Sequence, residues 1–163
     1  MTTGIGYDCH RLVEGRRLVL GGVEMEHELG LDGHSDADVL THAIIDAMLG
    51  ACALGDIGQH FPDTDPRHRD ADSIQLLRAT VTLLRDAGFG VAHVDATVVL
   101  ERPKLAPVRD QMRARLATAL GLELDHVSVK ATRGERMGFV GREEGVAALA
   151  VATVRPVAAV RPL

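Results

Sequence analysis

Residues 145–155, GVAALAVATVR, limit the possible fold more than any other stretch of the sequence, because small or β-branched apolar side chains fill nearly every position before Arg155. Successive side chains of a strand point to opposite faces of a sheet. A strand that is apolar on both faces is typical of the interior of a sheet, where other strands flank it. The segment therefore predicts a central strand.

Other segments show the two-residue repeat of strands. In residues 3–10, Asp8 and His10 alternate with less polar neighbours and so point to one face. Residues 17–24 form a second extended stretch, in which a glycine pair indicates a bend or bulge, and the polar residues 26–34 predict a loop. The remaining strands are expected where β-branched residues concentrate or alternate, over 91–101 and 126–132.

Three segments show the repeat of amphipathic helices. The clearest begins at Ser35, which is followed three residues later by Asp38 in a variant of the capping box, and its apolar stripe runs to Ala51. Residues 55–72, rich in Gly, Pro and Asp, predict a long ordered loop. Two further helices are expected, one from an N-cap at Ser73 to a C-cap at Gly88, and one over 106–120, opened by Pro107 and closed by Gly121.

These segments together predict an α/β fold, an α+β sandwich with about three helices on one face of a mixed sheet of four or five strands. The 163 residues suffice for one domain. We assign residues 1–155 to a single catalytic domain and expect residues 156–163, which contain two prolines, to fray as a C-terminal tail. A sheet face without helices requires another partner, which points to an oligomer.

Composition narrows the class of partner. The net charge is −5 and only 2% of residues are aromatic, so the basic surface and stacking platforms typical of nucleic-acid binding are not expected. No stretch is apolar enough to span a membrane, and the first residues do not resemble a secretion signal. Two cysteines, Cys9 and Cys52, are too few for a disulfide framework and fit a reducing cytoplasm. We therefore expect a cytoplasmic protein.

Histidine and aspartate concentrate in the first half of the chain, which suggests that this half carries the chemistry. Asp8 and His10 share one strand face, and His42 lies on the polar face of the first helix. Two histidines and a carboxylate with an open position are typical of catalytic zinc, and non-haem iron uses the same set. Histidines that only make hydrogen bonds within the core or at the surface, and bind no metal, would give the same sequence pattern. Asp38 and Asp46, one turn to either side of His42, are candidate acceptors for its other ring nitrogen.

Further polar residues suggest a phosphorylated ligand. His34 and Ser35 stand at the expected helix N-terminus, where free amides favour an anion, although a plain N-cap would look alike. The carboxylates of residues 55–65 suit ligand hydroxyls better than phosphates, and they are equally common in turns. Lys104 and Lys130 are candidate cations for phosphate, and Glu135 is a candidate oxygen ligand for Mg²⁺. Phe139 and Arg142 place an aromatic ring and a guanidinium between glycines.

Several longer runs are more specific than these separate residues. The longest is GHSDADVLTHAIIDAMLGACALGDIG, at residues 33–58, and the others are GYDCHRL, HFPDTDP, RPK, VSVKAT and GFVGREEG. Together they resemble the 2-C-methyl-D-erythritol 2,4-cyclodiphosphate synthase family of non-mevalonate isoprenoid biosynthesis. The resemblance spans residues 4 to about 145, nearly the whole chain.

The resemblance implies a phosphorus–oxygen lyase. Such an enzyme converts 4-diphosphocytidyl-2-C-methyl-D-erythritol 2-phosphate into 2-C-methyl-D-erythritol 2,4-cyclodiphosphate and CMP, by attack of the 2-phosphate on the β-phosphorus. It also implies one zinc ion per subunit, Mg²⁺ or Mn²⁺ with the substrate diphosphate, and a homotrimer with active sites between subunits. Because the substrate carries its own nucleophile, Cys9 is expected to point away from the metal and into the core.

The resemblance also assigns individual residues. Zinc would be held by Asp8, His10 and His42, and the second metal by Glu135. Phosphate would be held by His34, Ser35 and Thr132, with His34, Thr132 and Arg133 as catalytic residues. The methylerythritol pocket would be lined by Asp56, Ile57, Gly58, Phe61, Pro62, Asp63, Thr64 and Asp65. The cytidine part would be bound by Pro103, Lys104 and Leu105, and the residues near the channel of the trimer would be Phe139 and Arg142.

The sequence departs from the family pattern in two places. Arg133 stands where the family commonly has a second threonine, and a guanidinium can neutralise phosphate in its place. Glu101 and Arg102 replace smaller side chains beside the cytidine segment. Two alternatives use the same residues: a metal-dependent hydrolase or oxygenase, and a trimeric module that binds metal or an isoprenoid phosphate without turnover. Zinc content and CMP release separate the three.

Overall fold

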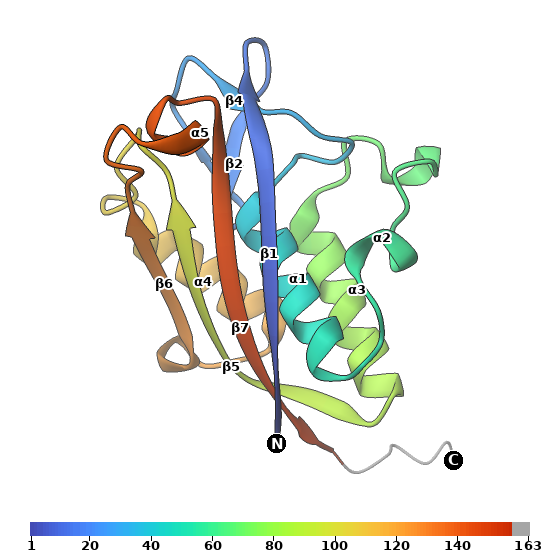
Figure 1. Ribbon diagram of the computed structural model, residues 1–163. Coiled ribbons are helices and arrows are strands. Elements are labelled where there is room, and N and C mark those ends of the chain that lie inside the picture. Colours follow the sequence, from blue (N-terminus) through green and yellow to red (C-terminus); the bar gives the residue numbers. More distant parts are fainter. Residues whose placement is uncertain (158–163) are drawn as a thin grey trace.

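The computed structural model describes residues 1–157 (Figure 1). Among the helices of that range, none is both long and apolar enough to cross a membrane. The elements in chain order are β1 (Thr2–Val13), β2 (Leu18–Leu20), β3 (Val23–Met25), β4 (Gly30–Leu31), α1 (Val39–Ala51), α2 (Ile57–His60), the 3-10 turn η1 (Pro66–His68), α3 (Ser73–Asp86), β5 (Phe89–Val99), α4 (Arg109–Leu120), the 3-10 turn η2 (Leu124–His126), β6 (Val127–Thr132), α5 (Gly138–Gly141) and β7 (Gly145–Pro156).

The apolar strand β7 lies at the centre of the main sheet, as its sequence predicts. Within the described chain this sheet has the order β4-β1-β7-β5-β6; β7 is antiparallel to β1 and β5, and β5 is parallel to β6. Strands β2 and β3 form a separate pair, joined at Gly21 and Gly22, whose positive φ angles make the predicted bend. The longer helices α1, α3 and α4 lie on one side of the sheet (Figure 1), which confirms the predicted α+β sandwich.

Helix α1 packs directly on β1 because β1 presents glycines to it. A Cβ atom added to Gly6 would lie 2.0 Å from the carbonyl oxygen of Ala43, and one added to Gly4 would lie 2.1 Å from that of Ala47. Behind α1, strand β7 contributes small buried residues such as Ala148. The covered face of the sheet therefore combines small strand residues with the fully buried aliphatic side chains of α1.

The opposite face of the sheet, which we call the open face, carries large exposed apolar side chains. Ile5 is 70% exposed and Tyr7 53%, and their partners Val151 and Leu149 on β7 are 39% and 41% exposed. Cys9 follows them along β1 and is exposed as well. The expectation that Cys9 points into the core is therefore wrong: its side chain does turn away from Asp8 and His10, but the alternation of β1 places it on the open face.

The start of α1 differs from the prediction. Its N-cap is Asp38, whose side chain accepts from the Thr41 amide, and not Ser35. Ser35 accepts instead from the amide of Ala37, which has a φ of 56°. A left-handed residue cannot continue a right-handed helix, so the chain turns once before α1 begins at Val39.

Most other boundaries shift by one to three residues. Asp72, not Ser73, caps α3, and its C-cap is Ala87, followed by Gly88 at a φ of 84°. Helix α4 begins at Arg109 rather than at 106, but its predicted end at Gly121, with a φ of 68°, is confirmed. Two of the expected loops contain short elements: β4 lies within 26–34, and α2 and η1 lie within 55–72. Strand β7 runs through Pro156, and residues 158–163 of the predicted tail lie outside the described residues.

Candidate metal centre and substrate pocket

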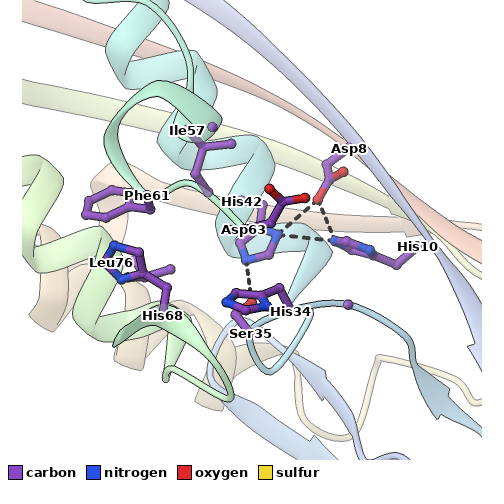
Figure 2. A pocket seen from close by; sticks show the side chains of 12 residues that line it. Asp8, His10, His34, Ser35, His42, Ile57, Phe61, Asp63, His68 and Leu76 are labelled. Atoms are coloured by element: carbon purple, nitrogen blue, oxygen red, sulfur yellow. Dashed lines mark hydrogen bonds and ion pairs between the residues drawn. The ribbon is translucent and has the colours of Figure 1, made fainter. Parts of the chain in front are cut away.

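Asp8, His10 and His42 meet at the end of the covered face. Asp8 and His10 continue the β1 face that carries Gly4 and Gly6, and that face points toward α1. The Asp8 Oδ2 atom lies 3.0 Å from His10 Nε2 and 3.1 Å from His42 Nδ1, and the two nitrogens lie 3.3 Å apart (Figure 2). The structure thus brings together the three residues that the sequence singles out.

The three residues suit a divalent cation. Each offers one ligand atom, and these atoms lie within 4.8 Å of one another. Two imidazole nitrogens with one carboxylate oxygen, partly buried and open on one side, form the donor set that catalytic zinc prefers. The donor set fits zinc, and it does not by itself identify the metal.

The electrostatics of the cluster favour positive charge between these groups. Burial opposes ionisation of Asp8, but hydrogen bonds from His10 and His42 outweigh it and hold the pKa of Asp8 well below its usual range. Burial likewise disfavours charge on His42, yet the hydrogen bond to Asp8 and the nearby carboxylates raise its pKa. A proton or a metal ion between the carboxylate and the imidazoles satisfies the same requirement.

A cavity of about 450 Å³ opens beside the cluster. Nine of its lining residues are among those expected from the sequence, whereas Gly33, His68 and Leu76 are not. His68 lies in the loop 55–72, whose length and composition marked it as a candidate, but no spacing singled out this histidine. The expected lining residues are Asp8, His10, His34, Ser35, His42, Ile57, Gly58, Phe61 and Asp63 (Figure 2).

Several expected residues have other tasks in this structure. The carboxylate of Asp56 caps α2 at Gln59, and Asp46 accepts from the amide of Ile57. Asp38 caps α1 and also accepts from the amides of Gly21 and Gly22. The expectation that Asp38 or Asp46 holds the second nitrogen of His42 is therefore wrong, because each carboxylate binds backbone amides instead.

The loop 61–65 is likewise only partly directed at the cavity. Pro62, Thr64 and Asp65 do not line it. The side chain of Asp65 binds Arg67, at 2.6 Å, and this pairing lowers the pKa of Asp65 to about 2. Its carbonyl oxygen lies 3.1 Å from His34 Nε2, a bond that ties the two loops together.

His34 and Ser35 line the cavity although they do not form a helix N-terminus. Arg16, which the sequence analysis missed, holds their segment: its guanidinium donates to the carbonyls of Leu31, Gly33 and Ser35, the last at 2.7 Å. Nothing in the spacing of the sequence marks this arginine, because its partners are these backbone carbonyls and the carboxylate of Asp70, which is far away in the sequence and lies 3.2 Å from Arg16 Nη1. The expectation that His34 and Ser35 stand at the N-terminus of this helix is wrong, because α1 begins at Val39 and Asp38 caps it through the Thr41 amide.

A second group of expected residues lies around another cavity of about 300 Å³, lined by Pro103, Lys104, Leu105, Thr132 and Arg133 among others. It shares no lining residue with the first cavity. Its lining residues Ala131, Thr132 and Arg133 are the last two residues of β6 and the residue that follows. In Figure 1 β6 lies on the left of the view, whereas α2 lies on the right.

Three more expected residues lie outside both cavities. Glu135 is exposed and 3.5 Å from Arg133. Phe139 is also exposed, and Arg142 pairs with Glu144 at 2.9 Å. A single copy of the chain therefore separates the metal cluster from the residues expected to hold cytidine and the second metal.

The fold and the cluster together define a class, an α+β sandwich protein in which two histidines and one aspartate form a candidate metal site beside a pocket. The YgbB family model matches residues 1–155, and the chain belongs to the YgbB family. Its sequence is 61% identical over 155 residues to the 2-C-methyl-D-erythritol 2,4-cyclodiphosphate synthase of Salinibacter ruber (strain DSM 13855 / M31), covering 95% of this chain and 99% of that protein. The family resemblance expected from the sequence motifs is confirmed.

Solved structures give the same result. A structure of 2C-methyl-D-erythritol-2,4-cyclodiphosphate synthase bound to CDP has a TM-score of 0.86 and 37% identity, covering 94% of this chain and 99% of that chain. The bifunctional IspDF from Campylobacter jejuni has a TM-score of 0.92 and 40% identity, covering 98% of this chain. This chain spans only 43% of the bifunctional protein and so corresponds to one part of it.

Proposed function

We propose that this chain cyclises 4-diphosphocytidyl-2-C-methyl-D-erythritol 2-phosphate to 2-C-methyl-D-erythritol 2,4-cyclodiphosphate and releases CMP, in non-mevalonate isoprenoid biosynthesis. The observation that carries the proposal is the convergence of Asp8, His10 and His42 beside a cavity, in a chain that belongs to the YgbB family. Near full-length relatives with this activity in their names support it.

The reaction needs positioning and charge neutralisation more than a protein nucleophile. An oxygen of the 2-phosphate forms a bond to the β-phosphorus, the bond from that phosphorus to the bridging oxygen breaks, and its electron pair leaves with CMP. Water is not consumed. Because two anionic groups must approach each other, the protein has to supply positive charge and hold the substrate in line.

The cluster residues would supply that charge through a bound metal. Zn²⁺ on Asp8, His10 and His42, as a Lewis acid, would neutralise and orient phosphate oxygens. Glu135 offers one carboxylate oxygen for Mg²⁺ or Mn²⁺, which commonly bind through one carboxylate, waters and substrate phosphates.

Residues around the cavity would bind the rest of the substrate. Ser35 Oγ already accepts from the amide of Ala37, so its own proton is available to a phosphate oxygen in the cavity. His34 would also contact phosphate, and the loop carrying Ile57 and Asp63 would hold the methylerythritol part. The segment 103–105 would hold cytidine, with Thr132 and Arg133 at the neighbouring phosphates.

A homotrimer would complete this site, with one copy supplying the metal cluster and its neighbour the cytidine segment. The separation of the two cavities in one chain supports an intersubunit site. The exposed apolar residues of the open face support assembly, because single subunits rarely leave such a patch in water. The free thiols of Cys9 and Cys52 agree with a cytoplasmic location.

The test is to incubate the purified protein with the diphosphocytidyl substrate, and to measure its zinc content, CMP release and the phosphorus product. We expect zinc, CMP and the cyclic diphosphate. A hydrolysed co-product would indicate a metal-dependent hydrolase, and zinc without CMP would indicate a binding module; either result overturns the proposal.

His42→Ala is the first variant to test. It removes one ligand atom of the cluster but leaves the apolar residues of α1 in place, so we expect loss of zinc and of turnover, by about 1,000-fold or more, with the oligomer preserved. Full activity in this variant would refute the assignment of the metal site. Circular dichroism and the mass in solution check that the fold and the assembly survive.

A further inference from the structure

We propose that Ser73 and Asp36 are positioning residues for His42, and that together they raise the affinity of the cluster for a divalent metal ion. The inference rests on the metal centre of the proposed function, and adds Asp36 and Ser73, of which the sequence predicts only a helix N-cap at Ser73. Both residues lie on the side of His42 that faces away from Asp8 and His10.

The contacts form a continuous chain from the imidazole to a carboxylate. His42 Nε2 lies 2.9 Å from Ser73 Oγ, and the hydroxyl of Ser73 donates to Asp36 Oδ1. The second oxygen of Asp36 accepts from the backbone amide of Ser73 at 3.1 Å. Ser73 is fully buried, so water cannot replace these bonds.

This chain of bonds determines which nitrogen of His42 carries a proton. The hydroxyl proton of Ser73 is committed to the carboxylate of Asp36, so Ser73 Oγ can only accept from His42. Nε2 is then the protonated nitrogen, and the lone pair of a neutral ring lies on Nδ1, which faces Asp8. Two acceptors 3.1 Å apart repel unless a cation lies between them, so the arrangement prepares Nδ1 as a metal ligand.

Asp36 is itself fixed. Its backbone amide donates to the carbonyl of Ala71 at 3.0 Å, and its carboxylate also accepts from the amide of Asp38 at 3.2 Å. Asp36 therefore links the segment before α1 to the start of α3. Through Ser73, the position of α3 determines the orientation of a ring on α1.

Ser35 is a second hydroxyl near the same nitrogen, but it cannot replace Ser73. Its Oγ lies 3.2 Å from His42 Nε2, farther than Ser73 Oγ. The Ser35 hydroxyl accepts from the Ala37 amide, and no carboxylate contact directs its own proton away from the ring. Only Ser73 is locked as an acceptor.

The test has to separate positioning of His42 from capping of α3, because Asp36 also binds the first amide of that helix. Asp72 offers a matched control. Its side chain accepts from the Ile74 amide at 2.9 Å, one residue further along α3, and makes none of the hydrogen bonds to His42. Ser73→Ala and Asp36→Asn disrupt the chain of bonds, whereas Asp72→Ala weakens only the cap.

Zinc affinity is measured by competition with a chromogenic chelator, and the absorption spectrum of the Co²⁺-loaded protein reports the surroundings of the ligands. We expect zinc affinity to fall about 10- to 100-fold in Ser73→Ala, and by less in Asp36→Asn, with altered cobalt bands in both. Asp72→Ala should keep its zinc affinity within about twofold and its cobalt spectrum unchanged, while its thermal stability falls, because alanine offers no acceptor to the Ile74 amide.

Unchanged zinc affinity in Ser73→Ala, or an equal loss in Asp72→Ala, would overturn the inference. Neither result bears on the proposed function, which the wild-type product assay decides alone. Conversely, a wild-type protein that binds zinc but forms no cyclic product would contradict the proposed function. The zinc affinities of the Ser73 and Asp36 variants would still test whether these residues position His42.

Discussion

The two faces of the main sheet are built from the same strands in opposite ways. On the covered face, β1 presents Gly4 and Gly6, and α1 packs against them at backbone distance. On the open face, the intervening residues of β1 are Ile5 and Tyr7, large apolar side chains that are more than half exposed. One face is covered within a single chain, and the other leaves large apolar side chains exposed, which is typical of an interaction surface.

The comparison also shows why the chemistry lies where it does. Asp8 and His10 continue the covered face of β1, so the close approach of α1 is what brings His42 to them. The precise position of a metal ligand then depends on backbone packing, while the open face is available for assembly. The first prediction below disrupts the covered face, and the second disrupts the open one.

Gly6→Ala should have the largest effect on folding. The added methyl would lie 2.0 Å from the carbonyl oxygen of Ala43, a backbone atom that can move only if α1 moves away from β1. We expect the free energy of unfolding to fall by about 3 kcal/mol, with weaker zinc binding. Chemical denaturation at a fixed protein concentration measures it.

Gly50→Ala is the matched control, because the nearest atom to its added Cβ is 3.9 Å away and the residue lies within α1. Replacing this helical glycine should stabilise the protein by about 0.5–1 kcal/mol. Equal stability of the two variants would contradict the account of the covered face.

Val151→Asp should abolish assembly without unfolding the subunit. Val151 is 39% exposed, pairs with Ile5 and lies in the central strand of the open face. A charge there would be desolvated and unpaired in a trimer but solvated in a monomer. Light scattering after gel filtration should give the mass of one subunit, with normal circular dichroism.

The control for this variant is Gln111→Asp, the same charge on the exposed surface of α4, which should leave the mass unchanged. A Val151→Asp protein that retains the mass of the wild type would show that the open face is not the interface. It would then leave the exposed patch of β1 and β7 without an explanation.

The covered and open faces also show how far the sequence could be interpreted. Alternation in β1 and the apolar β7 predicted the strands, the central position of β7 and the shared direction of Asp8 and His10. Alternation could not tell which face the helices cover, because β7 is apolar on both. The sequence therefore predicts correctly that Cys9 points away from Asp8 and His10, but it does not predict that this side of β1 is the open face.

The site shows the same limit at the level of single residues. Asp8, His10 and His42 could be predicted because ligand chemistry and spacing mark them. Arg16, Ser73 and Asp36 could not, because their partners are backbone atoms or residues far away in the sequence. Local propensity also misplaced the start of α1, where the left-handed Ala37 follows a turn that only tertiary contacts select.

Arg133→Thr should have a modest effect on turnover. Arg133 lies at the end of β6, on the side of the sheet away from the metal cluster, and its guanidinium is 3.5 Å from Glu135. The substitution restores the residue common in the family and leaves the Glu135 carboxylate free for a cation. We expect activity to be preserved or raised, by up to about threefold, which steady-state assays of CMP release would measure. Complete loss would show that the guanidinium has become essential.

The smallest expected effect is the pH dependence of the ion pair between Asp95 and Lys130, whose atoms lie 2.6 Å apart. Asp95 on β5 pairs in register with Val151 on β7, so its side chain lies on the open face of the sheet. Burial alone would raise the pKa of Asp95, but the hydrogen bond from Lys130 outweighs it and lowers the pKa. A lowered pKa in the folded state stabilises the protein above about pH 4, and this stability is lost as the pH falls through the folded pKa.

Because both side chains are more than a third exposed, the pair should contribute at most about 0.5 kcal/mol. Lys130→Met should therefore reduce the loss of stability between about pH 5 and pH 3 only slightly, as measured by denaturation at each pH. A change of several kcal/mol would contradict the exposed geometry, and would indicate that the subunit interface proposed at Ile5 and Val151 extends across β5 to β6. The size of this small effect thus measures how much of the open face a second copy covers.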